Sequence, residues 1–175
     1  MITSFLSLFS RGGAKALPVV RPLLEIELVP QSTWENNLRS RLTPGEWRQV
    51  KNKTFELANW KCEKCGGQGG QHPVECHEEW YYDDVRLIQR LVRTIALCPD
   101  CHQAVHFGLA RVKGIESKAR AQLMKVNNWN ADQVDTYIAA ASRIGFQRSQ
   151  RQWQIDVSWL DKFVEKIPSA QTSLF

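Results

Sequence analysis

The chain has 175 residues, of which 43% are hydrophobic and 23% are charged, and it carries a formal net charge of +5. This composition is ordinary for a globular protein, and no apolar run approaches the roughly 18 residues of a membrane-spanning helix. The basic excess is compatible with a polyanionic partner, although many basic proteins bind no nucleic acid. We therefore expect one domain with its own hydrophobic core.

The two ends are predicted to lie outside this domain. Residues 1–20 open on the apolar stretch MITSFLSLFS, and the basic residues follow it, which is the reverse of their order in a signal peptide. We expect a flexible arm there, a domain over residues 21–167, and a frayed tail over residues 168–175. The cysteine spacing suits a metal better than disulfides, which predicts a reducing, cytoplasmic location.

Two elements are predicted before the first cysteine. Residues 23–29 (LLEIELV) alternate sufficiently for a strand, and Pro30 ends it. A helix then begins with Thr43 as its N-cap, has Glu46 in the position that completes a capping box, and runs to about Asn59. This helix leads directly into a region rich in cysteine and histidine.

All five cysteines and all four histidines lie between positions 62 and 108. Cys62 and Cys65 form one C-x2-C pair, and Cys98 and Cys101 form a second. Two such pairs supply four thiolates, the number that a structural tetrahedral zinc ion takes. The paired spacing predicts a zinc site and disfavours the alternatives, which are buried free thiols or a disulfide.

The residues between the two pairs are predicted to fold as strand, turn, strand and helix. His77 lies in the apolar and aromatic stretch VECHEEW, a turn is expected over 83–86, and the second strand covers 91–97. Pro99 then opens a short helix that Gly108 is expected to end, since proline favours the first turn of a helix and glycine the position after its last.

Within that helix, His102 and His106 are four residues apart and therefore lie on one face. Cys101 is rotated by about 100° from His102 by the helical period, so it is free to face the zinc while the histidines face a separate site. The alternative is that only His102 binds a metal and that His106 interacts with the helix dipole.

The C-terminal part is predicted to be a mainly helical extension over residues 115–167. Helices are expected over 117–126 and 131–148, the second with Asn130 and Gln133 as a capping pair. A strand is expected over residues 153–157, followed by a helix from Ser158 to about Lys166. We also consider a pairing of this strand with the one near residue 25, which would bring the chain ends together.

A C-x2-C pair, a histidine on the first hairpin strand and the run L-C-P-x-C-H-x3-H on a helix together resemble the HNH endonucleases. The resemblance covers about a quarter of the chain, residues 60–108. It implies an α+β fold, with a zinc-clamped ββα-metal core flanked by N- and C-terminal helices and short strands. It also implies metal-dependent hydrolysis of DNA phosphodiester bonds.

The resemblance assigns roles to individual residues. His77 matches the general base that activates water, and the alternatives for it are a metal ligand or a buried core histidine. His102 and His106 match ligands of a catalytic metal, for which we consider Zn²⁺, Ni²⁺, Mn²⁺ and Mg²⁺. Cys62, Cys65, Cys98 and Cys101 match the structural zinc ligands of the four-cysteine subgroup.

Two positions depart from the family pattern. Cys76 stands where the family usually has a metal-binding Asp or His; as a ligand it would favour zinc, and otherwise it is a small buried hydrophobic residue. Neighbours on a strand face opposite sides, so Cys76 and His77 share a cleft only where the strand ends or bulges. Arg93 replaces the usual Asn, and we hypothesise that it holds the scissile phosphate.

These departures support a second interpretation, a zinc-stabilised HNH-fold module that has lost its chemistry and binds DNA or a protein as a scaffold. An acidic cluster near His77 also supports it, since carboxylates repel a phosphate backbone. We expect that cluster to be a solvated surface, and it consists of Glu75, Glu78, Glu79, Asp83 and Asp84.

Overall fold

The computed structural model describes residues 22–164, so the expected arm over 1–20 and tail over 168–175 lie outside the described residues. The described chain is a mixed α/β protein, as predicted, with three strands and seven α-helices. Its elements are η1 (Gln31–Thr33), α1 (Leu38–Arg41), α2 (Pro44–Leu57), β1 (Glu75–Asp83), β2 (Ile88–Leu97), α3 (Pro99–Val105), α4 (Phe107–Val112), α5 (Glu116–Asn127), α6 (Ala131–Ser149), β3 (Gln154–Asp156) and α7 (Ser158–Val164).

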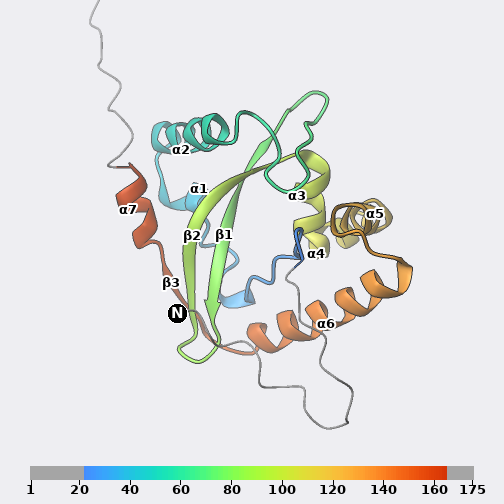
Figure 1. The fold of residues 1–175 in the computed structure, drawn as a ribbon. Coiled ribbons are helices and arrows are strands. Elements are labelled where there is room, and N and C mark those ends of the chain that lie inside the picture. The colour runs from blue at the N-terminus through green and yellow to red at the C-terminus, as the bar shows by residue number, and fades with distance from the viewer. Residues whose placement is uncertain (1–21, 165–175) are drawn as a thin grey trace, which may run out of the picture.

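A three-stranded sheet in the order β1-β2-β3 lies at the centre of the molecule. β1 and β2 form an antiparallel hairpin, and β3 pairs with β2 in parallel. The hairpin turn is closed by Asp83, whose carboxylate accepts hydrogen bonds from the backbone N–H groups of Val85 and Arg86. Helices flank the sheet on both sides, with α1, α2 and α7 on one side and α3, α4 and α5 on the other (Figure 1).

The hairpin contains a bulge, and as a result β2 contributes buried side chains to both faces of the sheet. Glu79 pairs with Arg93, but Trp80 pairs with Leu91, so Val92 is an extra residue on β2. An extra residue reverses the alternation of side chains beyond it. Ile95 consequently packs toward α3 and α5, whereas Leu91 packs toward α1, α2 and α7.

Two hydrophobic cores result, and β2 contributes to both. The first surrounds α3 and α5, and its fully buried members are Leu24, Leu97, Cys101, Ala104, Leu123 and Val134. The second joins α1, α2 and α7 to the sheet, and its buried members are Leu38, Val50, Leu91 and Leu160. No helix in the described part of the chain combines the length and the apolar character that crossing a membrane requires.

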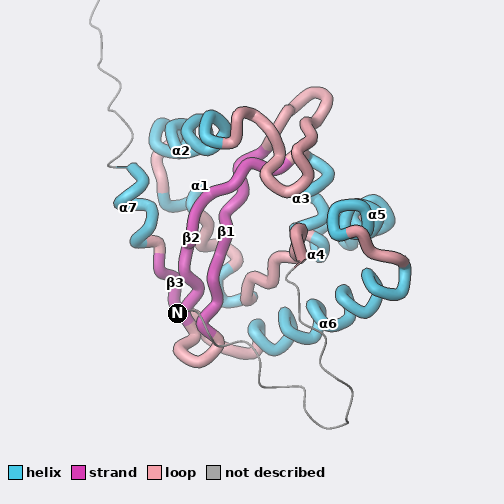
Figure 2. The backbone as a smooth tube through the Cα atoms, viewed as in Figure 1, coloured by secondary structure: helices cyan, strands magenta, loops and turns pink. Residues whose placement is uncertain are grey.

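The strand predicted over residues 23–29 is wrong, and so is its pairing with the last strand. The segment is irregular, as the loop colouring shows (Figure 2), and its backbone N–H groups bond to helices instead of a strand. Ile26 N–H donates to the hydroxyl of Tyr137 in α6, and Glu27 N–H donates to the carbonyl of Val105 in α3. With these donors used, the segment cannot add a strand to the sheet.

The helix predicted to end at Gly108 instead breaks earlier and then continues. His106 has φ −85° and ψ 49°, which separates α3 from α4, and Gly108 lies inside α4. The chain turns away at Gly114, where φ is +71° and glycine is the residue that adopts this conformation without strain. The break leaves His102 in α3 and His106 at the junction.

The capping predictions are confirmed. Thr43 accepts a hydrogen bond from the backbone of Glu46, whose side chain accepts one from the Thr43 backbone, so α2 begins with a complete capping box. Asn130 and Gln133 form the same arrangement at the start of α6. Each capping box depends only on residues that are three positions apart, and both form in the folded protein.

Candidate metal centre

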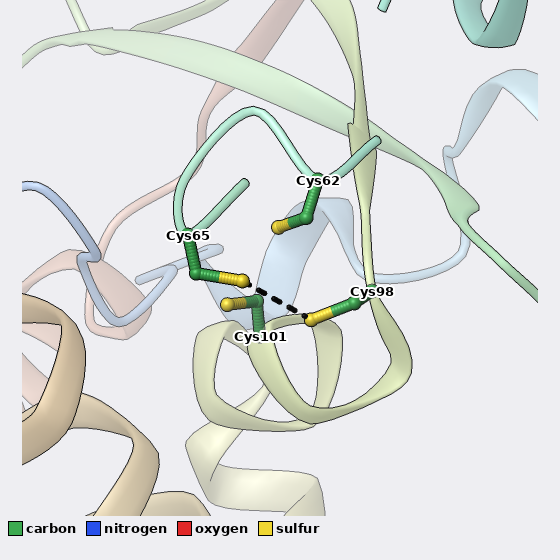
Figure 3. Close-up of side chains that lie close together, drawn as sticks. All are labelled: Cys62, Cys65, Cys98 and Cys101. Atoms are coloured by element: carbon green, nitrogen blue, oxygen red, sulfur yellow. Dashed lines mark hydrogen bonds between the residues drawn. The ribbon is translucent and has the colours of Figure 1, made fainter. Parts of the chain in front are cut away.

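The four paired cysteines converge at one end of the hairpin. Cys62 and Cys65 lie in the loop after α2, Cys98 lies between β2 and α3, and Cys101 lies in α3. The four sulfurs point toward one another (Figure 3). The loop is tight because Gly66 N–H donates to the carbonyl of Cys62 across 2.8 Å. Gly66 has a φ of +72°, which a side chain would strain.

The spacing of the four sulfurs fits a metal. All four lie within 4.8 Å of one another, and the sulfurs of Cys65 and Cys98 are 3.6 Å apart. A tetrahedral zinc ion with bonds of about 2.3 Å holds its sulfur ligands about 3.8 Å apart. The cluster could therefore hold a metal ion such as zinc, as the sequence predicted.

The surroundings stabilise negative charge on the sulfur of Cys62 and oppose it on Cys98 and Cys101. The hydrogen bond with Cys101 lowers the pKa of Cys62 to about 4, whereas burial raises the pKa of Cys98 to about 11. Backbone N–H of Gly67 donates to Cys65, and the side-chain amide of Gln122 donates to Cys101 across 3.1 Å. Because burial opposes ionisation of further thiols, a divalent cation is the group that would allow all four to become thiolates.

A second group of potential ligands lies on the α3 side of the sheet. His77 of β1, His102 of α3 and His106 at the α3–α4 junction offer ring nitrogens that all lie within 4.8 Å of one another. The centroids of the His102 and His106 rings are 4.7 Å apart, and that of His77 lies 4.9 Å from His106 and 5.3 Å from His102. His77 is buried, and the other two are partly exposed.

A carboxylate lies beside the Nδ1 atom of two of these rings. Glu75 accepts a hydrogen bond from Nδ1 of His102, and Oε2 of Glu27 lies 3.4 Å from Nδ1 of His106. A proton on each Nδ1 leaves both Nε2 atoms with lone pairs, and these Nε2 atoms are only 3.2 Å apart. Two nitrogen ligands of a tetrahedral metal are separated by about 3.3 Å, so the pair matches the spacing of metal ligands.

The environment of His77 and His106 favours the neutral form of both rings. Burial, with the charges of His106 and His102, lowers the pKa of His77 well below its usual value. Burial, together with His102, also lowers the pKa of His106 to about 4. A neutral imidazole is the form that binds a metal or accepts a proton, so both kinds of chemistry are open to this group.

Cys76 does not join the histidines, contrary to its prediction as a ligand of the second metal. β1 is regular at this point, so its neighbour His77 faces α3 while Cys76 faces α2. Its thiol donates to the hydroxyl of Thr54 in α2 across 3.9 Å, and burial raises its pKa to about 11. The buried hydrophobic role is the one that this position fits.

Arg93 is occupied by carboxylates. Its Nε donates to Glu79 across 2.7 Å, and its Nη1 donates to Glu63 across 2.5 Å. Glu63 lies between Cys62 and Cys65 in the sequence, and its carboxylate also accepts a hydrogen bond from the backbone N–H of Ala96. Arg93 thus connects the cysteine loop to the sheet, and a phosphate would have to compete with two carboxylates for it.

The carboxylates of the acidic cluster, expected to form a solvated surface, are partly exposed, and each also has a specific partner. Glu75 bonds to His102, Glu78 to the Leu38 backbone, Glu79 to Arg93, Asp83 to its own turn, and Asp84 to Arg148.

Two residues of the site were missed by sequence reasoning, Glu27 and Gln122. Glu27 lies in an apolar run assigned to a strand, and its only signal is a carboxylate among residues that become buried. Gln122 carries no sequence signal, because its position in α5 relative to Cys101 depends on how the helices pack. No protein-family model, no curated protein and no solved structure matches the chain.

Proposed function

We propose that this chain is a metal-dependent nuclease of the HNH kind, with a structural zinc ion on the four cysteines and a second metal on the histidines. One observation carries the proposal: His77, His102 and His106 bring ring nitrogens from β1 and α3 within 4.8 Å of one another. The arrangement of β1, β2 and α3, with cysteines at one end, supports a ββα-metal core.

The ligand chemistry favours a transition metal at the second site. Neutral imidazoles suit Zn²⁺ and Ni²⁺ better than Mg²⁺, which prefers oxygen ligands, and Mn²⁺ lies between them. Such a metal supplies Lewis acidity and lowers the pKa of bound water. The residues of this chain would hold it through the Nε2 atoms of His102 and His106, whose Nδ1 atoms face carboxylates.

His77 has two roles open to it. The resemblance makes it the general base, and its lowered pKa leaves the imidazole neutral, with a free lone pair, but also makes it a weaker base than an exposed histidine. Its distance from His102 and His106 equally suits a third metal ligand. These roles are separable, because removal of a base leaves the metal bound whereas removal of a ligand weakens its binding.

A phosphodiester substrate agrees with the charges close to the histidines. The charge of Lys64 acts on His77, and the charge of Lys113 acts on His106. Lys113 lies on the exposed end of α4 and is available to contact phosphate. Lys64 is paired with Glu79 across 3.2 Å, so it is Lys113, with the net charge of +5, that supports DNA as the substrate.

The second candidate function is a zinc-stabilised scaffold that binds DNA or a protein without cutting. The observation that favours it is Arg93, which replaces the expected Asn and is held by Glu63 and Glu79. Glu27 and Glu75 add further negative charge beside the histidines.

Metal content per chain and cleavage of plasmid DNA with added Mg²⁺, Mn²⁺ or Ni²⁺ distinguish the two functions. The nuclease predicts a second metal that is lost in His102→Ala, together with cleavage that is lost in His77→Ala. His72→Ala is the matched control, since His72 is exposed and lies outside the histidine group. If every variant contains one zinc ion and the wild type does not cleave DNA, the nuclease is excluded and the scaffold function is supported.

A further inference from the structure

The carboxylate of Glu27 lies between two of the three clustered histidines. Its Oε1 is 3.7 Å from Nε2 of His77, and its Oε2 is 3.4 Å from Nδ1 of His106. The side chain is 11% exposed, so water contributes little to its solvation. A buried carboxylate is costly unless it is paired, and these imidazoles are the partners within reach.

The backbone that leads into Glu27 is anchored by hydrogen bonds to helices α3, α5 and α6. Leu24 forms two hydrogen bonds with the side-chain amide of Asn127, across 3.0 and 2.9 Å. Ile26 N–H donates to the hydroxyl of Tyr137 across 2.8 Å, and Glu27 N–H donates to Val105 across 2.9 Å. Helices α3, α5 and α6 therefore determine where the carboxylate lies.

We propose that Glu27 is a positioning carboxylate of the histidine metal site, which orients His77 and His106 and balances the charge of a bound transition-metal ion. This rests on the proposed function, because it requires a metal on the histidines. Carboxylates behind metal-binding histidines fix the ring orientation and the protonated nitrogen, and their loss lowers metal affinity by about 10- to 100-fold.

The proposal gives the C-terminal extension a function. The hairpin and α3 supply the three histidines, but the carboxylate beside His77 and His106 comes from a segment that α5 and α6 hold in place. The metal site would then be complete only when the extension is folded against that segment.

The test uses the full-length, zinc-loaded protein with Ni²⁺ as the probe. Calorimetric titration measures the affinity for Ni²⁺. Glu27→Gln keeps the shape of the side chain and removes its charge, and we expect Ni²⁺ affinity to fall about 10- to 100-fold. Glu25→Gln is the matched control, because it removes the same charge two residues away on the same segment. Unchanged Ni²⁺ affinity in Glu27→Gln would overturn the proposal.

Thermal unfolding separates positioning from a merely structural role. Without Ni²⁺, Glu27→Gln should unfold at the same or a higher temperature than the wild type, because the substitution removes a buried carboxylate. Added Ni²⁺ should raise the unfolding temperature of the wild type by more than that of the variant. A variant that is destabilised equally with and without Ni²⁺ would count against positioning.

A second variant acts on the backbone rather than on the carboxylate. Tyr137→Phe removes the hydroxyl that accepts from Ile26 N–H, and we expect a several-fold loss of Ni²⁺ affinity with the zinc content unchanged. His102→Ala separates the two levels of the proposal. If Ni²⁺ binding to the wild type does not depend on His102, the proposed metal site fails; if it does depend on His102 but not on Glu27, only the role of Glu27 fails.

Discussion

Gln122 and Cys101 are joined by a hydrogen bond of 3.1 Å in which the side-chain amide donates to the sulfur. Both residues are buried, and they come from different helices, α5 and α3. An N–H donor disperses the negative charge of a thiolate, and hydrogen bonds to charged groups are stronger than neutral ones. The cysteine site is therefore completed by a helix that lies outside residues 60–108, which contain all the cysteines.

Gln122→Leu should weaken zinc binding, because it replaces the amide with an apolar group of similar volume. Donors behind metal ligands typically change affinity by about 10- to 100-fold, and we expect a loss of this size. The rate of zinc transfer to a colorimetric chelator measures it. Gln103→Leu is the control, since Gln103 lines the same surface groove beside α5. Equal transfer rates for the wild type and Gln122→Leu would contradict the prediction.

Cys98→Ser and Cys76→Ala should have different effects, although each removes one thiol. Cys98 belongs to the four-sulfur cluster, so its loss should release zinc and lower the unfolding temperature, because structural zinc contributes folding free energy. Cys76 packs beside Thr54, so its loss should cost about 1 kcal/mol and leave the zinc content unchanged. Elemental analysis and thermal unfolding check both variants. Loss of zinc from Cys76→Ala would refute the conclusion that Cys76 lies outside the zinc site.

Features specified by neighbouring residues were predictable. The capping box at Thr43, the one at Asn130 and the two cysteine pairs each depend on a spacing of three residues, and all are present in the structure. The spacing of four between His102 and His106 likewise predicted the facing rings. In each case the local geometry of a helix or a tight loop is sufficient.

Features that depend on tertiary contacts were not predictable. The 22–30 segment has a strand-like pattern, but helices take its backbone donors, so Glu27 faces the histidines instead of entering a ladder. The bulge at Val92 reverses the alternation of β2, and no glycine or proline marks it. The alternation rule did hold at Cys76 and His77, where the strand is regular.

Glu78→Gln should stabilise the protein at neutral pH but not in acid. Burial raises the pKa of Glu78, and its Oε1 accepts from the N–H of Leu38 across 2.7 Å, a bond that glutamine can retain. A carboxyl whose pKa is raised by folding contributes most below its unfolded value of about 4.5 and loses this contribution as the pH rises through the folded pKa. Urea unfolding of both proteins between roughly pH 4 and pH 8 measures this effect. The unfolding free energy of Glu78→Gln relative to the wild type should increase as the pH rises, and a difference that does not change with pH would contradict the prediction.

Arg148→Met should destabilise the protein, because Arg148 is a buried arginine in α6. Its Nε and Nη2 each donate to the carboxylate of Asp84 across 3.0 Å, and the guanidinium lies 4.0 Å from the centre of the Tyr82 ring. Loss of one partner of a buried ion pair costs about 3–5 kcal/mol, and we expect the lower end since Asp84 is 35% exposed.

Arg143→Met is the matched control for Arg148→Met, because Arg143 is an exposed arginine of the same helix. Surface substitutions of this kind change the free energy of unfolding by about 0.5 kcal/mol or less. A double-mutant cycle with Asp84→Asn isolates the pair, since the coupling should vanish if Arg148 acts through the aromatic rings alone. Equal unfolding free energies for the two arginine variants would show that the ion pair between α6 and the hairpin turn does not stabilise the fold.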